Sequence, residues 1–293
     1  MSVVVSEKGS VNYYSSDSLA EYVRRLTYIK IKKHLYFRGL ADVRYDLSPS
    51  IDRVISGEDG KWLEKESRLV EFAEQRYPES FVKNSPALLI SNMQHYGIPT
   101  RMMDITGNAL IALYFACQET DDNSDGQVIV FDEHPVSSYN PYANIIADTY
   151  RLTNNAITSI DDYRYVVYQQ PYASTLLYRD WENDRDDKLL ECINRPLLVD
   201  VGAVNHRQIN QDGKFILFPN LIRKGKLLNE LATIDMSSEI VTAVIVIPYK
   251  AKKGILQKLE LVGITNSFVF PDNIEIVIDG IKQTIKKEVN LYG

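Results

Sequence analysis

Six side chains of types that bind or process substrates occur in one short stretch of this sequence. They are Gln94, His95, Thr100, Arg101, Asp104 and Thr106. Every residue from Ala109 to Cys117 is then apolar or aromatic. A helix formed by this run would be apolar on every face and must lie inside the fold. Because polar groups beside such a helix cost free energy unless they are paired or used, the stretch predicts a functional site.

The local signals around these residues predict how they are positioned. Gly97 and Pro99 mark the end of a helix, and an extended segment is expected from Thr100 to Asp104. Thr106 and Asn108 are suitable caps for the buried helix. The positive N-terminal end of that helix would then lie beside the polar residues and would favour an anionic group there.

The same polar residues have a purely structural interpretation. Gln94, His95 and Arg101 would then form a buried network that locks the turn, with His95 a hydrogen-bonded core histidine. Arg101 and Asp104 can also pair with each other, which would leave one for structure and one for substrate. We favour Asp104 as a site residue, because a carboxylate two residues before a buried helix cap costs free energy without a purpose.

Composition limits the classes of protein that fit this sequence. The chain has 293 residues, of which 45% are hydrophobic and 25% charged, and its net charge of −6 argues against a protein that coats nucleic acid through its overall field. A local basic groove stays possible at residues 30–33, 223–226 or 250–253. The two cysteines, the absence of metal-type spacing and the absence of a signal or spanning segment predict a cytoplasmic protein without disulfides, metal or membrane contact.

Periodicity along the chain predicts one α+β domain over residues 1–293, with a tyrosine-rich helical insertion at 137–195. Helices are expected at 16–33, 60–81, 84–96, 252–262 and 272–287. Strands are expected at 34–40, 127–131, 195–201 and 240–248, with a further strand at the end of 206–218. The strand at 127–131 is expected to lie beside the segment Thr100–Asp104. In the long charged helix, Leu63, Leu69, Val70 and Phe72 are expected to point inward.

The sequence also resembles a known family. Tyr36-Phe37-Arg38-Gly39, the spaced string Leu47-x-Pro-x-Ile-x-Arg53 and the long string Gln94-His-Tyr-Gly-Ile-Pro-Thr-Arg-x-x-Asp104 are similar to the FRG domain, named for its Phe-Arg-Gly tripeptide. The likeness continues in Arg207-x-x-x-Gln-x-Gly-x-Phe215 and in residues 261–272, so it extends over nearly the whole chain.

This resemblance implies a fold and a chemistry. The order of parts resembles an ADP-ribosyltransferase: a central mixed or split sheet whose first strand carries Arg38, a second strand with Thr106 that leads into a helix, and a late strand at Gln211 to Phe215. It implies NAD as the substrate, with Arg38, Asp104 and Gln211 as catalytic residues. Residues implied to bind NAD are Arg38, Gly39, Gln94, His95, Thr100, Arg101, Thr106 and Tyr114. The late strand lacks the usual Glu, so either Gln211 or Asp104 would take over its work, or the activity is absent.

Three classes of function follow. The first is an ADP-ribosyltransferase that acts as a bacterial toxin in a toxin–antitoxin or phage-defence system, modifies nucleic acid or protein, and has an antitoxin partner. The second is another hydrolase directed at nucleotides or nucleic acid. The third is a non-enzymatic module whose polar cluster shapes a partner surface.

Overall fold

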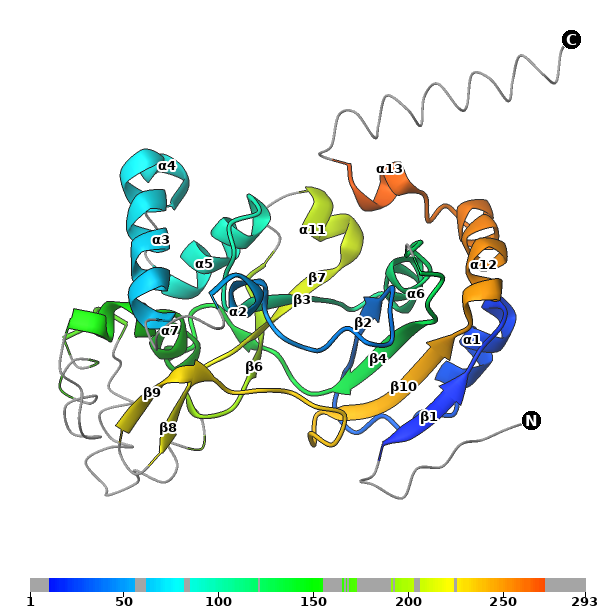
Figure 1. The fold of residues 1–293 in the computed structure, drawn as a ribbon, viewed down its shortest axis with the longest axis horizontal. Helices are drawn as coiled ribbons and strands as arrows, with labels where there is room; N and C mark the ends of the chain where they lie inside the picture. Colours follow the sequence, from blue (N-terminus) through cyan, green and yellow to red (C-terminus); the bar gives the residue numbers. More distant parts are fainter. Residues whose placement is uncertain are drawn as a thin grey trace, which may run out of the picture.

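A mixed β-sheet forms the centre of the molecule (Figure 1). The computed structural model describes residues 11–55, 62–81, 85–120, 122–154, 165, 167, 169–172, 191, 193–202, 206–223 and 226–271. The sheet has eight strands in the order β1 (Asn12–Ser15), β10 (Val241–Ile247), β4 (Gly126–Asp132), β2 (Leu35–Leu40), β3 (Met102–Thr106), β7 (Gly213–Leu217), β6 (Leu197–Asp200) and β5 (Val136–Ser137). The outer pairs β1–β10 and β5–β6 are parallel, and the others are antiparallel. The predicted α+β class with a large mixed sheet is therefore confirmed.

The sheet is split between β2 and β3. These strands pair at a single register position, Phe37 opposite Thr106. By contrast, β2 pairs with β4 along its whole length, and β3 pairs with β7 from Met102 to Thr106. Beyond the Phe37–Thr106 pair, the facing edges of β2 and β3 do not form ladder hydrogen bonds with each other. Side chains can therefore enter the gap between the two strands.

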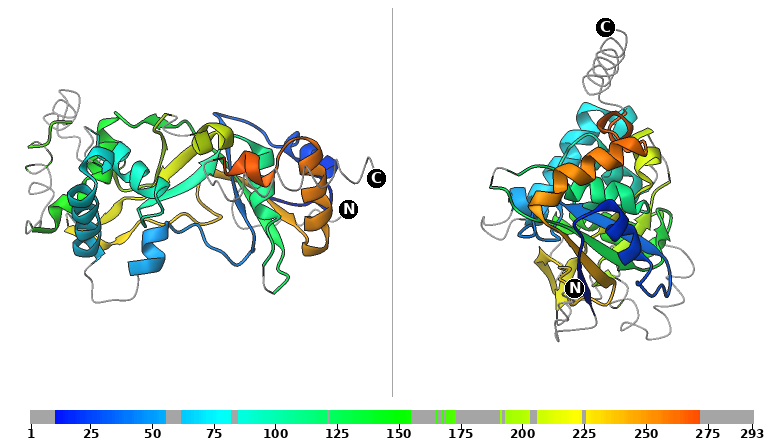
Figure 2. Two further views of the ribbon diagram at one scale, coloured as in Figure 1. Left: turned by 90° about the horizontal axis from the view of Figure 1, so that it is seen from above. Right: turned by 90° about the vertical axis from the view of Figure 1, so that its right-hand side faces the viewer.

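Helices cover both faces of the sheet. The helices α1 (Leu19–Leu26) and α12 (Tyr249–Leu261) lie side by side at the β1 end, as both views of Figure 2 show. At the opposite end, near the separate hairpin of β8 and β9, lie α3, α4, α5 and α7 (Figure 1). The remaining bounds are α2 (Ser50–Ile55), α3 (Trp62–Arg76), α4 (Pro78–Phe81), α5 (Pro86–His95), α6 (Ala109–Ala116), α7 (Pro141–Ala147), η1 (Thr149–Asn154), β8 (Asn220–Arg223), β9 (Lys226–Leu231), α11 (His206–Gln211) and α13 (Asn266–Val269).

The apolar helix α6 packs directly on β2 and β4, as its composition predicted. Ile111, Ala112 and Leu113 have no exposed surface. Gly39 of β2 allows this close approach, because a Cβ atom there would lie 1.8 Å from the Ala112 carbonyl oxygen and 2.8 Å from the Ala116 nitrogen. The glycine of the Phe-Arg-Gly tripeptide therefore fixes the distance between the sheet and the helix.

We expect Gly39→Ala to lower the free energy of unfolding by about 1–3 kcal/mol, because α6 must move away from β2 to admit a methyl group. Urea denaturation followed by circular dichroism measures this change. Gly254→Ala is the matched control: Gly254 lies within α12, and no atom beyond the adjoining residues and backbone of its own helix lies within 4 Å of the position that an added methyl group would take. This control should gain about 0.5–1 kcal/mol from helix propensity. Equal stability of the two variants would contradict the packing argument.

Several predicted elements need correction. β4 does not lie beside β3, because β2 lies between these two strands. The neighbours of β4 are β2 and β10. The helix predicted over 16–33 spans only Leu19–Leu26, since Ser18 caps it and the chain turns after Thr27. The helix predicted over 60–81 is two helices, with a break at Tyr77 before Pro78. Phe72 does not point inward, and 61% of its surface is exposed.

Other predictions fall partly outside the described residues. Within the predicted insertion at 137–195, the structure describes α7, η1 and a few further residues, and most of the segment lies outside the described ranges. The predicted helix at 272–287 lies wholly outside them. The other predicted strands and the helix at 252–262 occur within a few residues of their expected bounds.

Candidate functional site

Two adjoining chambers form a cleft beside the split in the sheet. We call the first the Arg38 chamber. It has a volume of about 180 Å³ and is lined by Phe37, Arg38, Gly39, Asp104, Ile105, Thr106, Phe115, Arg207 and Gln211. The second, the His95 chamber, has a volume of about 60 Å³ and is lined by Ser91, Gln94, His95, Asp104, Ile105, Arg207, Gln208, Gln211, Gly213 and Phe215. The four residues that line both chambers make them one continuous cleft.

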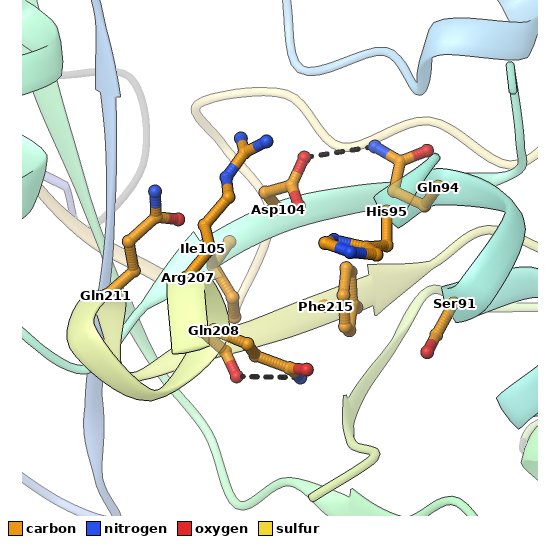
Figure 3. A pocket seen from close by; sticks show the side chains of 10 residues that line it. Ser91, Gln94, His95, Asp104, Ile105, Arg207, Gln208, Gln211 and Phe215 are labelled. Carbon is orange, nitrogen blue, oxygen red and sulfur yellow. Dashed lines mark hydrogen bonds between the residues drawn. The ribbon is translucent and has the colours of Figure 1, made fainter. Parts of the chain in front are cut away.

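Figure 3 shows how the elements supply the His95 chamber. Ser91, Gln94 and His95 approach from α5, whereas Arg207, Gln208 and Gln211 approach from α11 on the opposite side. Asp104 of β3 lies between the two helices. The cleft therefore depends on segments that are more than a hundred positions apart in the sequence, brought together by the pairing of β3 with β7.

Arg38 crosses the split in the sheet. Its Nη1 donates a hydrogen bond to the main-chain carbonyl of Asp104 on β3. Burial lowers the pKa of the Arg38 guanidinium, the Asp104 carboxylate opposes this shift, and the nearby Arg53 cation adds to it. An arginine still stays protonated at neutral pH. The buried Nε of Arg38 has no hydrogen-bond partner among the described residues.

Asp104 provides the negative charge of the cleft. Its Oδ2 accepts a hydrogen bond from Gln94 Nε2 at 3.0 Å, drawn as a dashed line in Figure 3. Gln94 is itself held in place, because its Oε1 accepts from the Thr100 hydroxyl at 2.7 Å. Among the described residues, Asp104 is the only carboxylate that lines either chamber. It is exposed to solvent rather than buried, which corrects the reasoning that its burial would demand a function.

Thr106 and Gln211 connect the sheet to α11. The Thr106 hydroxyl donates to the main-chain carbonyl of Gln211, and Gln211 Nε2 donates to the Val269 carbonyl at 2.9 Å. The sequence predicted that Gln211 lies on a strand, and this is wrong. Gln211 ends α11, and Asp212 turns the chain with a φ of 45° before β7 begins at Gly213.

The N-terminus of α6 is capped by a side chain of the preceding segment. Asn108 caps it, and its Oδ1 accepts from the main-chain nitrogens of Leu110 at 2.9 Å and Ile111 at 3.4 Å. The prediction of Asn108 as a cap is thus confirmed. The cap occupies two of the main-chain donors that the predicted use of this helix end for an anion would need.

Three predicted substrate-binding residues lie away from the cleft. Arg101 is completely buried and pairs with Glu66 of α3 rather than with Asp104. Thr100 is buried and supports Gln94. Tyr114 is buried in the core, where its hydroxyl donates to Asn266 Oδ1 at 3.0 Å. These positions correct the expectation that the three side chains face a substrate, and they agree with the structural interpretation of Arg101.

The predicted residues that do line the cleft are Arg38, Gly39, Gln94, His95, Asp104, Thr106 and Gln211. Sequence reasoning missed Ser91, Phe115, Arg207 and Gln208. The guanidinium carbon of Arg207 lies 5.1 Å from the centroid of the Phe270 ring, and Phe115 makes an edge contact with the same ring at 6.0 Å. Arg207 belongs to the string that supported the family resemblance, which was the one available signal for it.

The described part of the chain contains neither a metal site nor a membrane-spanning helix. No group of three or more histidine, cysteine, aspartate or glutamate side chains there could hold a metal ion. No helix in the same ranges has the length and apolar character needed to cross a bilayer.

Comparison with known proteins supports the resemblance of the sequence motifs. The family model described as the FRG domain matches residues 33–125, which run from β2 through α6 and include Arg38, Gln94 and Asp104. No curated protein and no solved structure matches the chain. The chain therefore contains an FRG domain, at residues 33–125.

Proposed function

We propose that this protein is an ADP-ribosyltransferase that uses NAD as its donor substrate. The observation that supports this most is that Arg38, Asp104, Thr106 and Gln211, which come from three separate parts of the sequence, line the same chamber. The order of elements agrees with the proposal: Arg38 on β2, Thr106 at the end of β3 before α6, and Gln211 just before β7. This order resembles that of the ADP-ribosyltransferases.

The charges of the cleft fit a substrate that contains a diphosphate. Arg38 and Arg207 line it, and Arg53 lies near enough to Arg38 to lower its pKa. Guanidinium groups form charge-assisted hydrogen bonds with phosphate oxygens. Such a concentration of cations in a protein of net charge −6 is a local field that favours an anionic ligand.

The chemistry of NAD cleavage needs few groups. The bond between the ribose C1 and the pyridinium nitrogen breaks, its electron pair stays on nitrogen, and neutral nicotinamide leaves an oxocarbenium-like sugar. A carboxylate that accepts a hydrogen bond from a ribose hydroxyl stabilises this positive charge. Since Asp104 is the carboxylate of the described cleft, we assign this role to it, and we assign Gln211 to orienting the ribose as an uncharged hydrogen-bonding group.

The size of the cleft limits how NAD would lie. Both chambers together enclose less than the roughly 300 Å³ at the lower end of typical ligand pockets. Only the nicotinamide and its ribose would therefore be enclosed, with Phe37 and Phe115 as apolar walls. The diphosphate would lie at the mouth near the arginines, and the adenosine end would lie outside.

Transfer of label from NAD tests this proposal. The protein is incubated with labelled NAD and, in separate reactions, RNA, DNA and protein from a bacterial lysate. We expect label on one acceptor class and a loss of about 10- to 100-fold with Arg38→Ala, the value of one or two charge-assisted hydrogen bonds. Arg68→Ala, at an exposed arginine of α3, is the control and should keep full activity.

The other outcomes separate the competing classes. Breakdown of NAD without transfer would indicate a hydrolase, and no reaction with any acceptor would contradict an enzymatic function and favour a partner-binding module. As a toxin of a toxin–antitoxin or defence system, the protein should arrest bacterial growth on expression, and Arg38→Ala should abolish the arrest. Growth rescue by a co-expressed neighbouring gene product would identify the proposed antitoxin partner.

A further inference from the structure

The His95 chamber contains a buried hydroxyl group that the fold does not use. Ser91 is 1% exposed, and its Oγ has no hydrogen-bond partner among the described residues. A serine inside a helix commonly donates to the carbonyl four residues earlier, and Ser91 does not. An unpaired buried hydroxyl is destabilising and calls for an explanation. Ser91 lines the chamber, so a molecule that enters can supply the missing partner.

We propose that the His95 chamber is the acceptor subsite of the transferase and that it receives the hydroxyl group of a serine or threonine side chain of a target protein. This inference rests on the proposed function. The Arg38 chamber would hold the donor, and Asp104 and Arg207, which line both chambers, mark the boundary where the two substrates meet.

The size and lining of the chamber favour a small neutral acceptor. A volume of about 60 Å³ has room for roughly four or five water-sized groups. Phe215 and Ile105 supply apolar wall, and Ser91 and His95 supply hydrogen-bonding groups. The chamber holds one cation, Arg207, and one carboxylate, Asp104, so a charged acceptor of either sign would be attracted by one of them and repelled by the other. A hydroxyl group avoids both repulsions and gives His95 a role.

The charge of the protein favours a polypeptide over a nucleic acid as the source of this hydroxyl. The net charge of −6 repels a polyanion at long range. A protein segment of low net charge is not subject to this long-range repulsion, whereas a nucleic acid is.

The transfer step balances with the groups present. The acceptor oxygen forms a bond to the ribose C1 as the bond from C1 to the pyridinium nitrogen breaks. The electron pair of that bond leaves with neutral nicotinamide, and the proton of the acceptor hydroxyl moves to the His95 imidazole. Ser91 Oγ would donate to or accept from the acceptor group and hold it in line.

Defined acceptors test the inference. The protein is incubated with NAD and N-acetylserine amide, and in parallel with N-acetylalanine amide, uridine or a short RNA. Released nicotinamide reports total cleavage, and mass spectrometry reports ADP-ribosyl products. We expect transfer to the serine amide alone. Ser91→Ala should lower the ratio of transfer to hydrolysis about tenfold, the effect of one lost hydrogen bond, with an unchanged KM for NAD. His95→Gln should slow transfer further.

Folding of the variants is controlled for. Ser91→Ala removes a hydroxyl without a partner and introduces the best helix former, so α5 should persist. Asn92→Ala is the matched control in α5, because Asn92 bonds the Ser80 carbonyl of α4 and lines neither chamber. It should leave the transfer ratio unchanged.

Each alternative outcome has a distinct meaning. If Ser91→Ala has the same ratio of transfer to hydrolysis as the wild-type protein, the inference is overturned. Transfer to uridine or RNA instead of the serine amide would also overturn it. If neutral hydroxylamine releases the label, the acceptor is a carboxylate, and this result would also overturn the inference. In these three cases NAD is still consumed and the proposed function stands. If no nicotinamide is released at all, the proposed function fails together with the inference.

Discussion

Replacing Arg101 with methionine is expected to lower the free energy of unfolding by about 3–5 kcal/mol, because it leaves Glu66 as an unpaired charge in the core. Arg101 has no exposed surface. Its Nε donates to Glu66 Oε1 at 2.7 Å, its Nη2 donates to Glu66 Oε2 and to Asn220 Oδ1, and its Nη1 donates to the Phe218 carbonyl. One side chain thus joins α3, β3 and the segment that enters β8.

Urea denaturation of the single and double variants measures this contribution. Arg101→Met and Glu66→Leu should each destabilise strongly, whereas the double variant should lose less than the sum of the two, because an apolar pair needs no charge compensation. The Phe218 carbonyl and Asn220 Oδ1 still lose their donor in it, so recovery should be partial. Arg101→Lys should be more stable than Arg101→Met but less stable than the wild-type protein, since lysine cannot make the forked contact with a carboxylate. Additive losses in the double variant would contradict the pairing, and an undisturbed Arg101→Met would contradict its structural role.

The position of Arg101 shows why its role could not be assigned from the sequence. Within the polar stretch it looks equivalent to Asp104, yet Arg101, just before β3, and Asp104, within β3, meet different partners. The partner of Arg101 is Glu66, one of several acidic residues in a charged helix, and only the tertiary packing of α3 distinguishes it from its neighbours. A local pattern predicts that a buried charge needs a partner and cannot identify it.

The buried helix α6 could be predicted with its cap because both signals are local. An uninterrupted apolar run begins directly after Asn108, and both the predicted burial and the predicted cap are confirmed. The face of the helix toward the cleft could not be predicted, because a helix that is apolar all round has no polar face to show its orientation. For that reason Tyr114 was expected to contact the ligand, whereas Phe115 lines the chamber and Tyr114 lies in the core.

The half of the cleft that α11 provides was the hardest to predict. The segment 206–218 combines polar residues with a strand, and the helix of six residues before β7 is too short to give a periodic signal. Arg207 and Gln208 therefore had no predicted position, although Gln211 was selected through the family resemblance. Their proximity to Asp104 follows from the pairing of β3 with β7, which is a long-range property of the sheet.

Replacing Asp104 with asparagine is expected to slow NAD cleavage by about 10²- to 10³-fold while NAD still binds. The substitution keeps the shape of the side chain, and its carbonyl oxygen can still accept from Gln94. It removes the negative charge that we assign to stabilising the oxocarbenium-like ribose, and loss of one such electrostatic contact costs a rate factor of this size. The diphosphate contacts that we propose for Arg38 and Arg207 would be unaffected, so the dissociation constant of NAD should change less than about threefold.

Single-turnover release of nicotinamide from NAD is the measurement that tests the cleft most directly. It is compared among the wild-type protein, Asp104→Asn and Asp235→Asn, whose carboxylate lies on the surface away from the cleft. We predict release by the wild type and by Asp235→Asn at the same rate, and release by Asp104→Asn that is at least about a hundred times slower with NAD still bound. Equal rates for all three proteins, or no release by the wild type, would contradict the role assigned to the cleft.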